Sequence, residues 1–230
     1  ELMKSVKEFG EPGFVWSDST ELLVNPCVEI GMWPVCEKTK ESGWQACNLS
    51  TINCSKIKTE QDFLDACRAA TIIGTLQAGF SKFEYLGGAS ERIISREALL
   101  GVSMTGIMEQ HEICLDPSAQ KRGASIVKKT NKKIADMIGI NQAARTTCIK
   151  PEGTSSCILG TSSGIHPHHA KRYIRRVQAN KMEPIYNYFK EVNPRACEES
   201  VWSNNDLLFW HIHHAVAFIE ETVHSLFNFR

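Results

Sequence analysis

The sequence predicts an α/β fold in which strands alternate with helices. Two long segments, residues 59–79 and 116–139, carry apolar residues at helical spacing behind N-terminal capping signals. Short apolar or β-branched segments predict strands, and these lie at 21–35, 49–57, 102–108 and 146–149. Strands that alternate with helices usually build a parallel sheet, so we expect an α/β architecture with parallel strands.

Both long helices have defined ends in the sequence. Thr59 followed three residues later by Asp62 resembles a capping box, and this helix should run to about Gly79. The second helix should begin at Asp116-Pro117, because proline is well tolerated in the first helical turn. Gly139 is a natural stop for it.

Two other segments are predicted less directly. A helix or turn should begin within residues 95–100, after the break at Gly87-Gly88. The basic run Lys171–Arg176 predicts the solvated face of a helix. The sequence contains no internal repeat and no low-complexity tract.

Length and composition are those of an ordinary globular chain. The 230 residues are 42% hydrophobic and 23% charged, and 26 basic side chains balance 26 acidic ones. This balance gives no overall field that favours nucleic acid or a membrane surface, so we expect neither as a partner. Any anion site must therefore be local.

The cysteines and the ends of the chain indicate a cytoplasmic protein. The nine cysteines are an odd number without Cys-x-x-Cys spacing, which favours reduced thiols over a disulfide framework or a structural zinc site. The start, Glu1–Lys4, lacks a signal-peptide core and an initiator methionine, so a fragment is expected. The longest uncharged apolar stretch, 207–219, is too short to span a bilayer.

The first chemical motif is Asn25-Pro26-Cys27-Val28-Glu29. If this segment is extended, alternate side chains point the same way, which would place an amide, a thiol and a carboxylate on one face. Such a group offers a hydrogen-bond donor, a hydrogen-atom carrier and a base. The alternative interpretation is a turn that leads into a strand, with Cys27 as a small apolar residue.

The second motif, Pro151–Ser156, follows the predicted strand 146–149. Its glycine allows close backbone approach, its hydroxyls offer donors, and a helix that starts here would aim N–H groups at an anion. These features predict a phosphate site, although the Walker pattern is absent. An ordinary polar turn with Ser/Thr caps is the alternative.

Two groups of histidines do not predict a metal site. His166, His168 and His169 form one group, and the other comprises His211, His213 and His214. Neither group has the i, i+4 spacing of a helical zinc site, and surface or loop positions explain them better, so we expect no metal.

Several segments together resemble the large chain of a ribonucleotide reductase, most of all the adenosylcobalamin-dependent (class II) type. The resemblance covers about residues 22–203, in the order of the family. The segments that carry it are Asn25–Ile30, Ala46–Leu49, Gly74–Gly79, Arg96–Val102 and Lys150–His169. It implies the second half of a ten-stranded α/β barrel of the ribonucleotide reductase and glycyl-radical type, with a partial catalytic barrel domain at 1–203 and a divergent tail at 204–230.

The resemblance also implies roles for individual residues. Cys27 would become the thiyl radical that removes the ribose 3′ hydrogen, Glu29 would take the 3′-hydroxyl proton, and Asn25 would hydrogen-bond the sugar hydroxyls. Cys47 would be one of two thiols that reduce the substrate and close to a disulfide. The substrate phosphates would bind Gly153, Thr154, Ser155 and Ser156.

The implied activity is reduction of ribonucleotides to deoxyribonucleotides for DNA synthesis. The expected cofactor is adenosylcobalamin and the expected type a vitamin B12-dependent ribonucleoside-diphosphate reductase, although di- and triphosphate substrates both stay open. A thioredoxin-like reductant and a homodimer of the full-length chain are expected partners, and this fragment alone should be inactive. Two alternatives stay open: a large subunit with a separate radical-generating subunit, and an inactive nucleotide- or metal-binding fragment.

Overall fold

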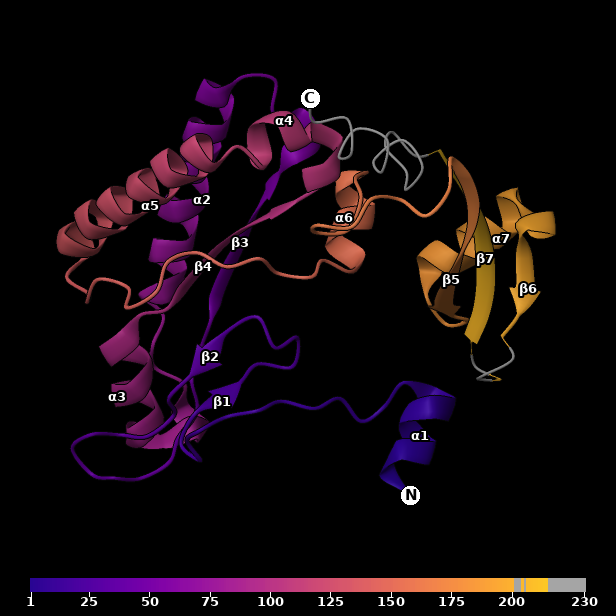
Figure 1. Cartoon of the computed structure of the whole chain (residues 1–230). Coiled ribbons are helices and arrows are strands. Elements are labelled where there is room, and N and C mark those ends of the chain that lie inside the picture. Colours follow the sequence, from indigo (N-terminus) through magenta and orange to yellow (C-terminus); the bar gives the residue numbers. More distant parts are fainter. Residues whose placement is uncertain (201–203, 205, 215–230) are drawn as a thin grey trace. The chain divides into compact units, whose positions relative to one another are not determined.

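The computed structural model describes residues 1–200, 204 and 206–214, with backbone alone at 175 and 206–214 (Figure 1). Positions 215–230 of the expected tail lie outside the described residues. The chain forms two compact units that are described separately below. Unit 1 comprises residues 1–51, 65–103 and 123–150, and unit 2 comprises 52–64, 104–122 and 151–230.

Helices and strands mix throughout, as the α/β prediction requires. Unit 1 holds α1 (Leu2–Phe9), the antiparallel pair β1 (Leu23–Val24) and β2 (Gly31–Met32), and α3 (Gly87–Glu97). Four elements contribute to both units: α2 (Glu60–Ala78), β3 (Asn48–Asn53), β4 (Leu100–Thr105) and α5 (Pro117–Ile138). The expectation of parallel strands is wrong for the pair β1–β2 and for both strand pairs of the three-stranded sheet in unit 2, which are antiparallel.

Strand β4 is the most buried element, because all six of its residues are buried. It pairs with β3, and at Gly101 a side chain would collide with Leu49 of that strand, which explains the glycine. The segment 145–148 forms a second backbone neighbour. Val102 N–H donates to Thr146 O at 3.0 Å and Cys148 N–H donates to Val102 O at 3.2 Å. This neighbour is parallel but forms only a bridge, so the strand predicted at 146–149 is reduced to one paired position.

The two predicted helix starts are confirmed in detail. Thr59 N–H donates to Asp62 Oδ2 at 2.8 Å and Asp62 N–H donates back to Thr59 Oγ1 at 3.2 Å, which is a complete capping box. The hydrogen bond to the Thr59 side chain is the largest cause that lowers the pKa of Asp62. At α5, Ala119 N–H donates to Asp116 Oδ1 at 2.6 Å, and Gly139 follows the last turn with a φ of 74°.

Three sequence expectations are wrong in their extent or type. A helix was predicted to begin within 95–100, but α3 begins at Gly87 and ends at Glu97. Gly87-Gly88 therefore opens this helix and does not separate two elements. The strand predicted at 102–108 ends at Thr105, where Gly106 turns the chain with a φ of 69°. The basic run Lys171–Arg176 was expected on a helix, but from Arg172 on it lies in strand β5 (Arg172–Asn180), whose backbone pairs with β7 (Asp206–His214). Its described side chains at 172, 174 and 176 are exposed, as a solvated face requires.

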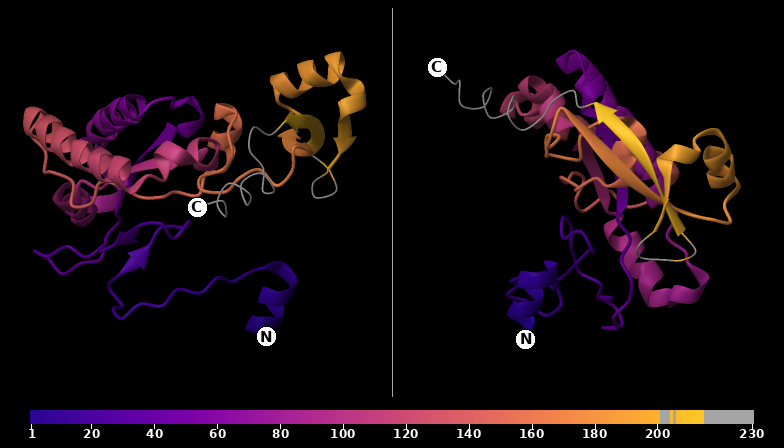
Figure 2. Two further views of the ribbon diagram at one scale, coloured as in Figure 1. Left: turned by 45° about the horizontal axis from the view of Figure 1, so that its top comes forward. Right: turned by 90° about the vertical axis from the view of Figure 1, so that its right-hand side faces the viewer.

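Unit 2 contains a three-stranded antiparallel sheet of order β5–β7–β6, with α7 beside it (Figures 1 and 2). The elements are β5 (Arg172–Asn180), α7 (Pro184–Val192), β6 (Cys197–Glu199) and β7 (Asp206–His214). Tyr186 of α7 is buried, and burial followed by the nearby Cys197 raises its pKa. The short helices α4 (His111–Cys114) and α6 (Thr154–Leu159) complete this unit, together with single 3₁₀ turns.

No described helix is long and apolar enough to cross a membrane.

A buried polar clamp joins α2 and α5, which lie side by side (Figures 1 and 2). Asn131 Nδ2 donates to Thr75 Oγ1 at 3.1 Å, and Asn131 Oδ1 accepts the N–H of Ala143 at 2.9 Å. Thr75 and Thr71 are both fully buried, and each hydroxyl donates to the carbonyl four residues earlier. Only the Thr75 hydroxyl also serves the partner helix.

We therefore predict that Thr75→Val lowers the free energy of unfolding by about 1–3 kcal/mol, because it leaves the buried Asn131 amide without its acceptor. Thr71→Val is the matched control. It removes only a local hydrogen bond within one helix and should cost less than about 1 kcal/mol. Urea unfolding of both variants measures the difference, and equal losses would contradict this role of Thr75.

Candidate functional site

The Asn25–Glu29 motif forms the turn of the β1–β2 hairpin. Asn25 N–H donates to Ile30 O at 3.3 Å, Val28 N–H donates to Asn25 O at 2.9 Å, and Ile30 N–H donates to Asn25 Oδ1 at 3.0 Å. Val28 has a φ of 66°. The strand with flanking loop expected in 21–35 is therefore a hairpin, and the motif is not extended: the alternative interpretation, a turn that leads into a strand, is the one that the structure has. The Asn-Pro pair initiates a turn that the Asn25 side chain closes.

The turn still presents two groups of the motif for chemistry. Cys27 is an exposed free thiol. Glu29 is half-buried, and neither carboxylate oxygen is accessible or has a hydrogen-bond partner among the residues that the structure describes. A buried carboxylate without a donor is costly, and such orphaned groups are often functional. Glu29 is thus suited to accept a hydrogen bond or a proton from a bound hydroxyl.

Cys47 shares the electrostatic environment of this turn. It is a half-buried free thiol, and its pKa is raised to about 11. Burial is the largest cause, the negative charge of Glu29 follows, Lys150 opposes the rise, and Cys27 adds to it. Glu29 and Cys27 of unit 1 thus act on Cys47 electrostatically, and its raised pKa favours the protonated thiol at neutral pH. The sequence assigned no role to Lys150.

The predicted phosphate loop belongs to unit 2. Gly153 precedes the six-residue α6, and Thr154 and Ser155 are exposed at its start. Ser156 is buried, and its hydroxyl donates to Gly153 O at 2.7 Å. The Ser155 hydroxyl donates to the carboxylate of Glu152. Among the predicted side-chain donors, the Thr154 hydroxyl is the one placed on the surface without such an internal bond.

A buried carboxylate supports the loop that follows. The Glu109 side chain is 1% exposed, and its Oε1 accepts the N–H of Ser162 at 2.6 Å and the Thr161 hydroxyl at 3.0 Å. His168 Nε2 lies 3.5 Å from the same oxygen, and the Tyr173 hydroxyl lies 3.2 Å from His168 Nδ1. Burial lowers the pKa of His168, against the opposing charge of Glu109. His168 is thus a packed residue of this network.

The end of β4 fixes the same loop. The Thr105 hydroxyl donates to Ser162 O at 2.9 Å and accepts the N–H of Gly164 at 2.8 Å. Gly106 faces Thr161 so closely that any side chain there would collide with it. The Ser163 hydroxyl reaches back to Glu152 O, next to the phosphate loop. The sequence singled out neither Thr105 nor Gly106 as a partner of this loop.

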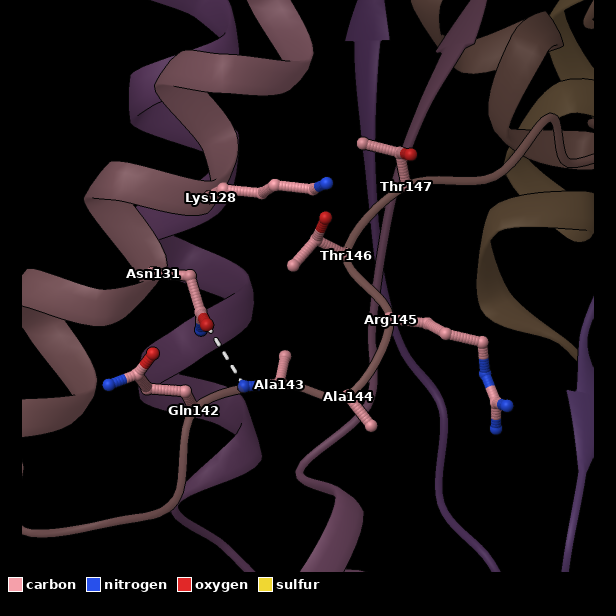
Figure 3. Close-up of a pocket in the computed structure, with 8 residues that line it drawn as sticks. All are labelled: Lys128, Asn131, Gln142, Ala143, Ala144, Arg145, Thr146 and Thr147. Atoms are coloured by element: carbon pink, nitrogen blue, oxygen red, sulfur yellow. Dashed lines mark hydrogen bonds between the residues drawn. The ribbon is translucent and has the colours of Figure 1, made fainter.

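A separate cavity of about 440 Å³ lies between α5 and the segment 142–147 (Figure 3). Asn131 lines it, but both ends of that amide are used in the helix clamp. The predicted site residues do not line this cavity. Across the described residues, no cluster of three or more His, Cys, Asp or Glu side chains is arranged to hold a metal ion.

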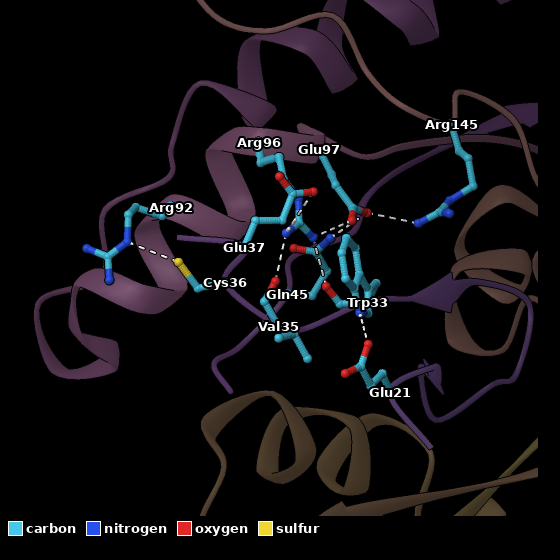
Figure 4. A network of polar contacts seen from close by, with 10 residues as sticks. All are labelled: Glu21, Trp33, Val35, Cys36, Glu37, Gln45, Arg92, Arg96, Glu97 and Arg145. Carbon is cyan, nitrogen blue, oxygen red and sulfur yellow. Dashed lines mark hydrogen bonds and ion pairs between the residues drawn. The ribbon is translucent and has the colours of Figure 1, made fainter. Parts of the chain in front are cut away.

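Cys36 is a third thiol, in the segment between Cys27 and Cys47 (Figure 4). Its sulfur accepts a hydrogen bond from Arg92 Nε at 3.2 Å. Hydrogen bonding to Thr39, followed by that to Arg92, lowers its pKa to about 6. The pKa values of Cys36 and Cys47 are therefore shifted in opposite directions, to about 6 and about 11.

The fold resembles part of a class II ribonucleotide reductase. A crystal structure of a B12-dependent (class II) ribonucleotide reductase superposes with a TM-score of 0.66 at 19% identity, over 94% of this chain and 35% of that chain. This likeness and the mixed helix and strand content bear out the α/β fold class.

Sequence relatives carry the corresponding names. A probable adenosylcobalamin-dependent ribonucleoside-triphosphate reductase of Dictyostelium discoideum is 25% identical in an alignment that covers 78% of this chain and 25% of that protein. An adenosylcobalamin-dependent ribonucleoside-triphosphate reductase of Lactobacillus leichmannii is 24% identical in an alignment that covers 89% of this chain and 32% of that protein. No family model matches the chain.

These similarities confirm the resemblance that the motifs predicted: the chain is related to the large chains of the class II ribonucleotide reductases. The chain spans about a quarter to a third of the length of these relatives.

We predict that Cys36 titrates near pH 6. Because its pKa is lowered, the thiolate is present above that pH and is lost as the pH falls through it. Thiolate absorbance near 240 nm should show this step in the wild-type chain and lose it in Cys36→Ser. Cys157→Ser, which changes an exposed thiol, is the control and should keep the step. A step that survives in Cys36→Ser would contradict the assignment.

Proposed function

We propose that these residues take part in the reduction of ribonucleotides to 2′-deoxyribonucleotides by a cysteine thiyl radical. The observation that carries the proposal is the shared environment of Cys27, Glu29 and Cys47, two thiols and a buried carboxylate. Two thiols can deliver two electrons by closing a disulfide, and a carboxylate within reach of a hydroxyl is a competent base.

Cys27 is the proposed site of the thiyl radical. Its exposure on a hairpin turn leaves the sulfur accessible to a cofactor and to a ribose. The relatives are named as adenosylcobalamin-dependent, and we propose the same cofactor for this chain. The accessible Cys27 thiol is the residue that would react with it. When bound, adenosylcobalamin supplies the radical. Cys27 would then exchange a hydrogen atom with the 3′ carbon of the substrate.

Glu29 is the proposed acceptor of the 3′-hydroxyl proton. Its two orphaned oxygens give it the capacity for this hydrogen bond, and substrate binding would supply the missing donor. The side-chain oxygen Oδ1 of Asn25 already accepts a hydrogen bond within the turn. The side-chain N–H₂ group of Asn25 would therefore donate the hydrogen bond to the sugar.

Cys47 is the proposed reducing thiol. A raised pKa keeps the proton on sulfur, so the residue can deliver hydrogen together with electrons. In the net reaction the substrate loses its 2′-hydroxyl as water, and the two thiols lose two electrons and two protons. The second thiol, a thioredoxin-like reductant that reopens the disulfide, and a homodimer of the full-length chain are further parts of the proposal.

The loop formed by Gly153, Thr154, Ser155 and Ser156 is the proposed binding site for substrate phosphates. The exposed Thr154 hydroxyl and the backbone at the start of α6 offer donors, whereas the buried Ser156 serves the shape of the loop. Both of the relatives described above are named triphosphate reductases, which favours a triphosphate over the diphosphate type first expected.

The wider setting is proposed from the same relatives. We propose that residues 1–203 form part of a catalytic barrel, its second half, and that 204–230 form a divergent tail to which we assign no role. Turnover should require the complete catalytic chain, because the second reducing thiol is expected outside these residues. Free thiols at Cys27, Cys36 and Cys47 support a reducing, cytoplasmic setting.

We predict that Cys27→Ser in the complete chain abolishes deoxynucleotide formation while nucleotide binding persists, because the stronger O–H bond prevents a hydroxyl from replacing the thiyl radical. Cys47→Ser is the contrasting variant: radical chemistry could still begin at Cys27, but no disulfide could close. Product formation and equilibrium nucleotide binding are measured together with adenosylcobalamin and a dithiol. Substantial turnover by Cys27→Ser would refute the assignment.

We predict that Thr154→Val weakens triphosphate binding by roughly tenfold, because one hydrogen bond to a charged acceptor is lost, worth about 1.5 kcal/mol. Thr154→Ser keeps the hydroxyl and should bind nearly as well as the wild type. Calorimetric titration with a ribonucleoside triphosphate and with the unphosphorylated nucleoside separates the two effects. Equal weakening for both ligands would point to structural damage instead.

A further inference from the structure

A buried ion-pair network gathers around Glu97, the last residue of α3 (Figure 4). The Glu97 side chain is 10% exposed. Its Oε1 accepts Arg96 Nη2 at 2.7 Å, and its Oε2 accepts Arg145 Nη2 at 2.9 Å and Gln45 Nε2 at 2.8 Å. Both carboxylate oxygens are therefore occupied by charged or amide donors from three parts of unit 1.

Through Arg96 the network holds the chain that leads away from the Cys27 turn. Arg96 donates from Nη2 to Trp33 O at 2.9 Å and from Nη1 to Val35 O at 2.7 Å. Its guanidinium also lies over the Trp33 ring, 4.6 Å from the centroid. One arginine thus fixes two carbonyls and a ring just after β2, and Glu97 fixes the arginine.

Through Gln45 the same carboxylate holds the chain that leads into Cys47, which is two residues further on. Just beyond the thiol, Asn48 is anchored by two hydrogen bonds to Leu99 O, from its N–H at 3.2 Å and from its side-chain Nδ2 at 2.9 Å. Cys47 therefore sits between two anchors that both come from the Glu97–Leu99 segment. A thiol fixed on both sides stays in its half-buried position beside Glu29.

We propose that Glu97 is a positioning residue for Cys47, and that Gln45 transmits its hold to the thiol. Glu97 has no described contact with either thiol, so it acts through the chain and not on the substrate. The inference rests on the proposed function for its meaning in catalysis, but the placement of Cys47 can be tested without turnover.

The test measures how fast iodoacetamide alkylates Cys47 at pH 8 in the 230-residue chain, resolved by peptide mass spectrometry. Glu97→Gln cannot accept hydrogen bonds at both ends, and Gln45→Met removes the amide that donates to Glu97, together with its unpartnered carbonyl oxygen, at similar volume. Both variants should raise the alkylation rate of Cys47 by about fivefold or more, because a thiol released from its half-buried position has a lower pKa. Each pKa unit of that fall gives roughly tenfold more thiolate. Glu37→Gln is the matched control: Glu37 lies 4.0 Å from Arg96 Nη1 and is 61% exposed, and its change should leave the rate unaltered.

Cys54 and Cys114, both buried in unit 2, report on general unfolding and should stay protected. The proposal is overturned if both variants leave Cys47 at the wild-type rate, or if both expose Cys54 and Cys114 to the same degree as Cys47. A selective rise in Gln45→Met alone supports it even where Glu97→Gln fails to fold. Selective exposure of Cys47 in a chain whose complete form lacks reductase activity would refute the proposed function and leave the placement of Cys47 intact.

Discussion

The burial of Glu97 is the constraint on which the thiol group of unit 1 depends. A carboxylate withdrawn from water must be matched by donors, and here two guanidinium groups and an amide supply them. Satisfying this charge fixes both the segment after the Cys27 turn and the segment before Cys47. The adjoining strand β4 is buried at every position, so the anchor at Leu99 cannot move without disturbing the core.

Unit 2 uses the same physical device at a second place. Glu109 is almost fully buried, and it holds the loop of Thr161 and Ser162 as Glu97 holds the thiol segments. In each unit a buried acid shapes a polar loop that carries or adjoins predicted chemistry. The Glu29 carboxylate differs from both, because neither of its oxygens has a hydrogen-bond partner in the part of the chain that is described, whereas Glu109 lacks one only at Oε2 and Glu97 uses both oxygens. That contrast separates acids that shape the structure from one that is available for a ligand.

Local signals in the sequence predicted local structure well. The capping box of Thr59 and Asp62 and the helix start at Asp116 follow from residues three apart, and both are present as predicted. At Asn25 the sequence offered both an extended segment and a turn that leads into a strand, and the structure has the turn, which the Asn25 side chain closes. The Glu97 and Glu109 networks join residues about 50 positions apart, so no pattern of spacing could reveal them. The site residues named from the resemblance stay predictions, although Cys27, Glu29 and Cys47 do lie in one environment.

The redox state of Cys47 after a single turnover tests the central claim most directly. The complete, prereduced chain would receive adenosylcobalamin and one equivalent of ribonucleoside triphosphate, without external reductant, and its thiols would then be mapped by alkylation and mass spectrometry. The account predicts that, as one equivalent of deoxynucleotide forms, Cys47 enters a disulfide with a second thiol while Cys27 stays reduced. Stoichiometric product with Cys47 still open to alkylation would contradict it.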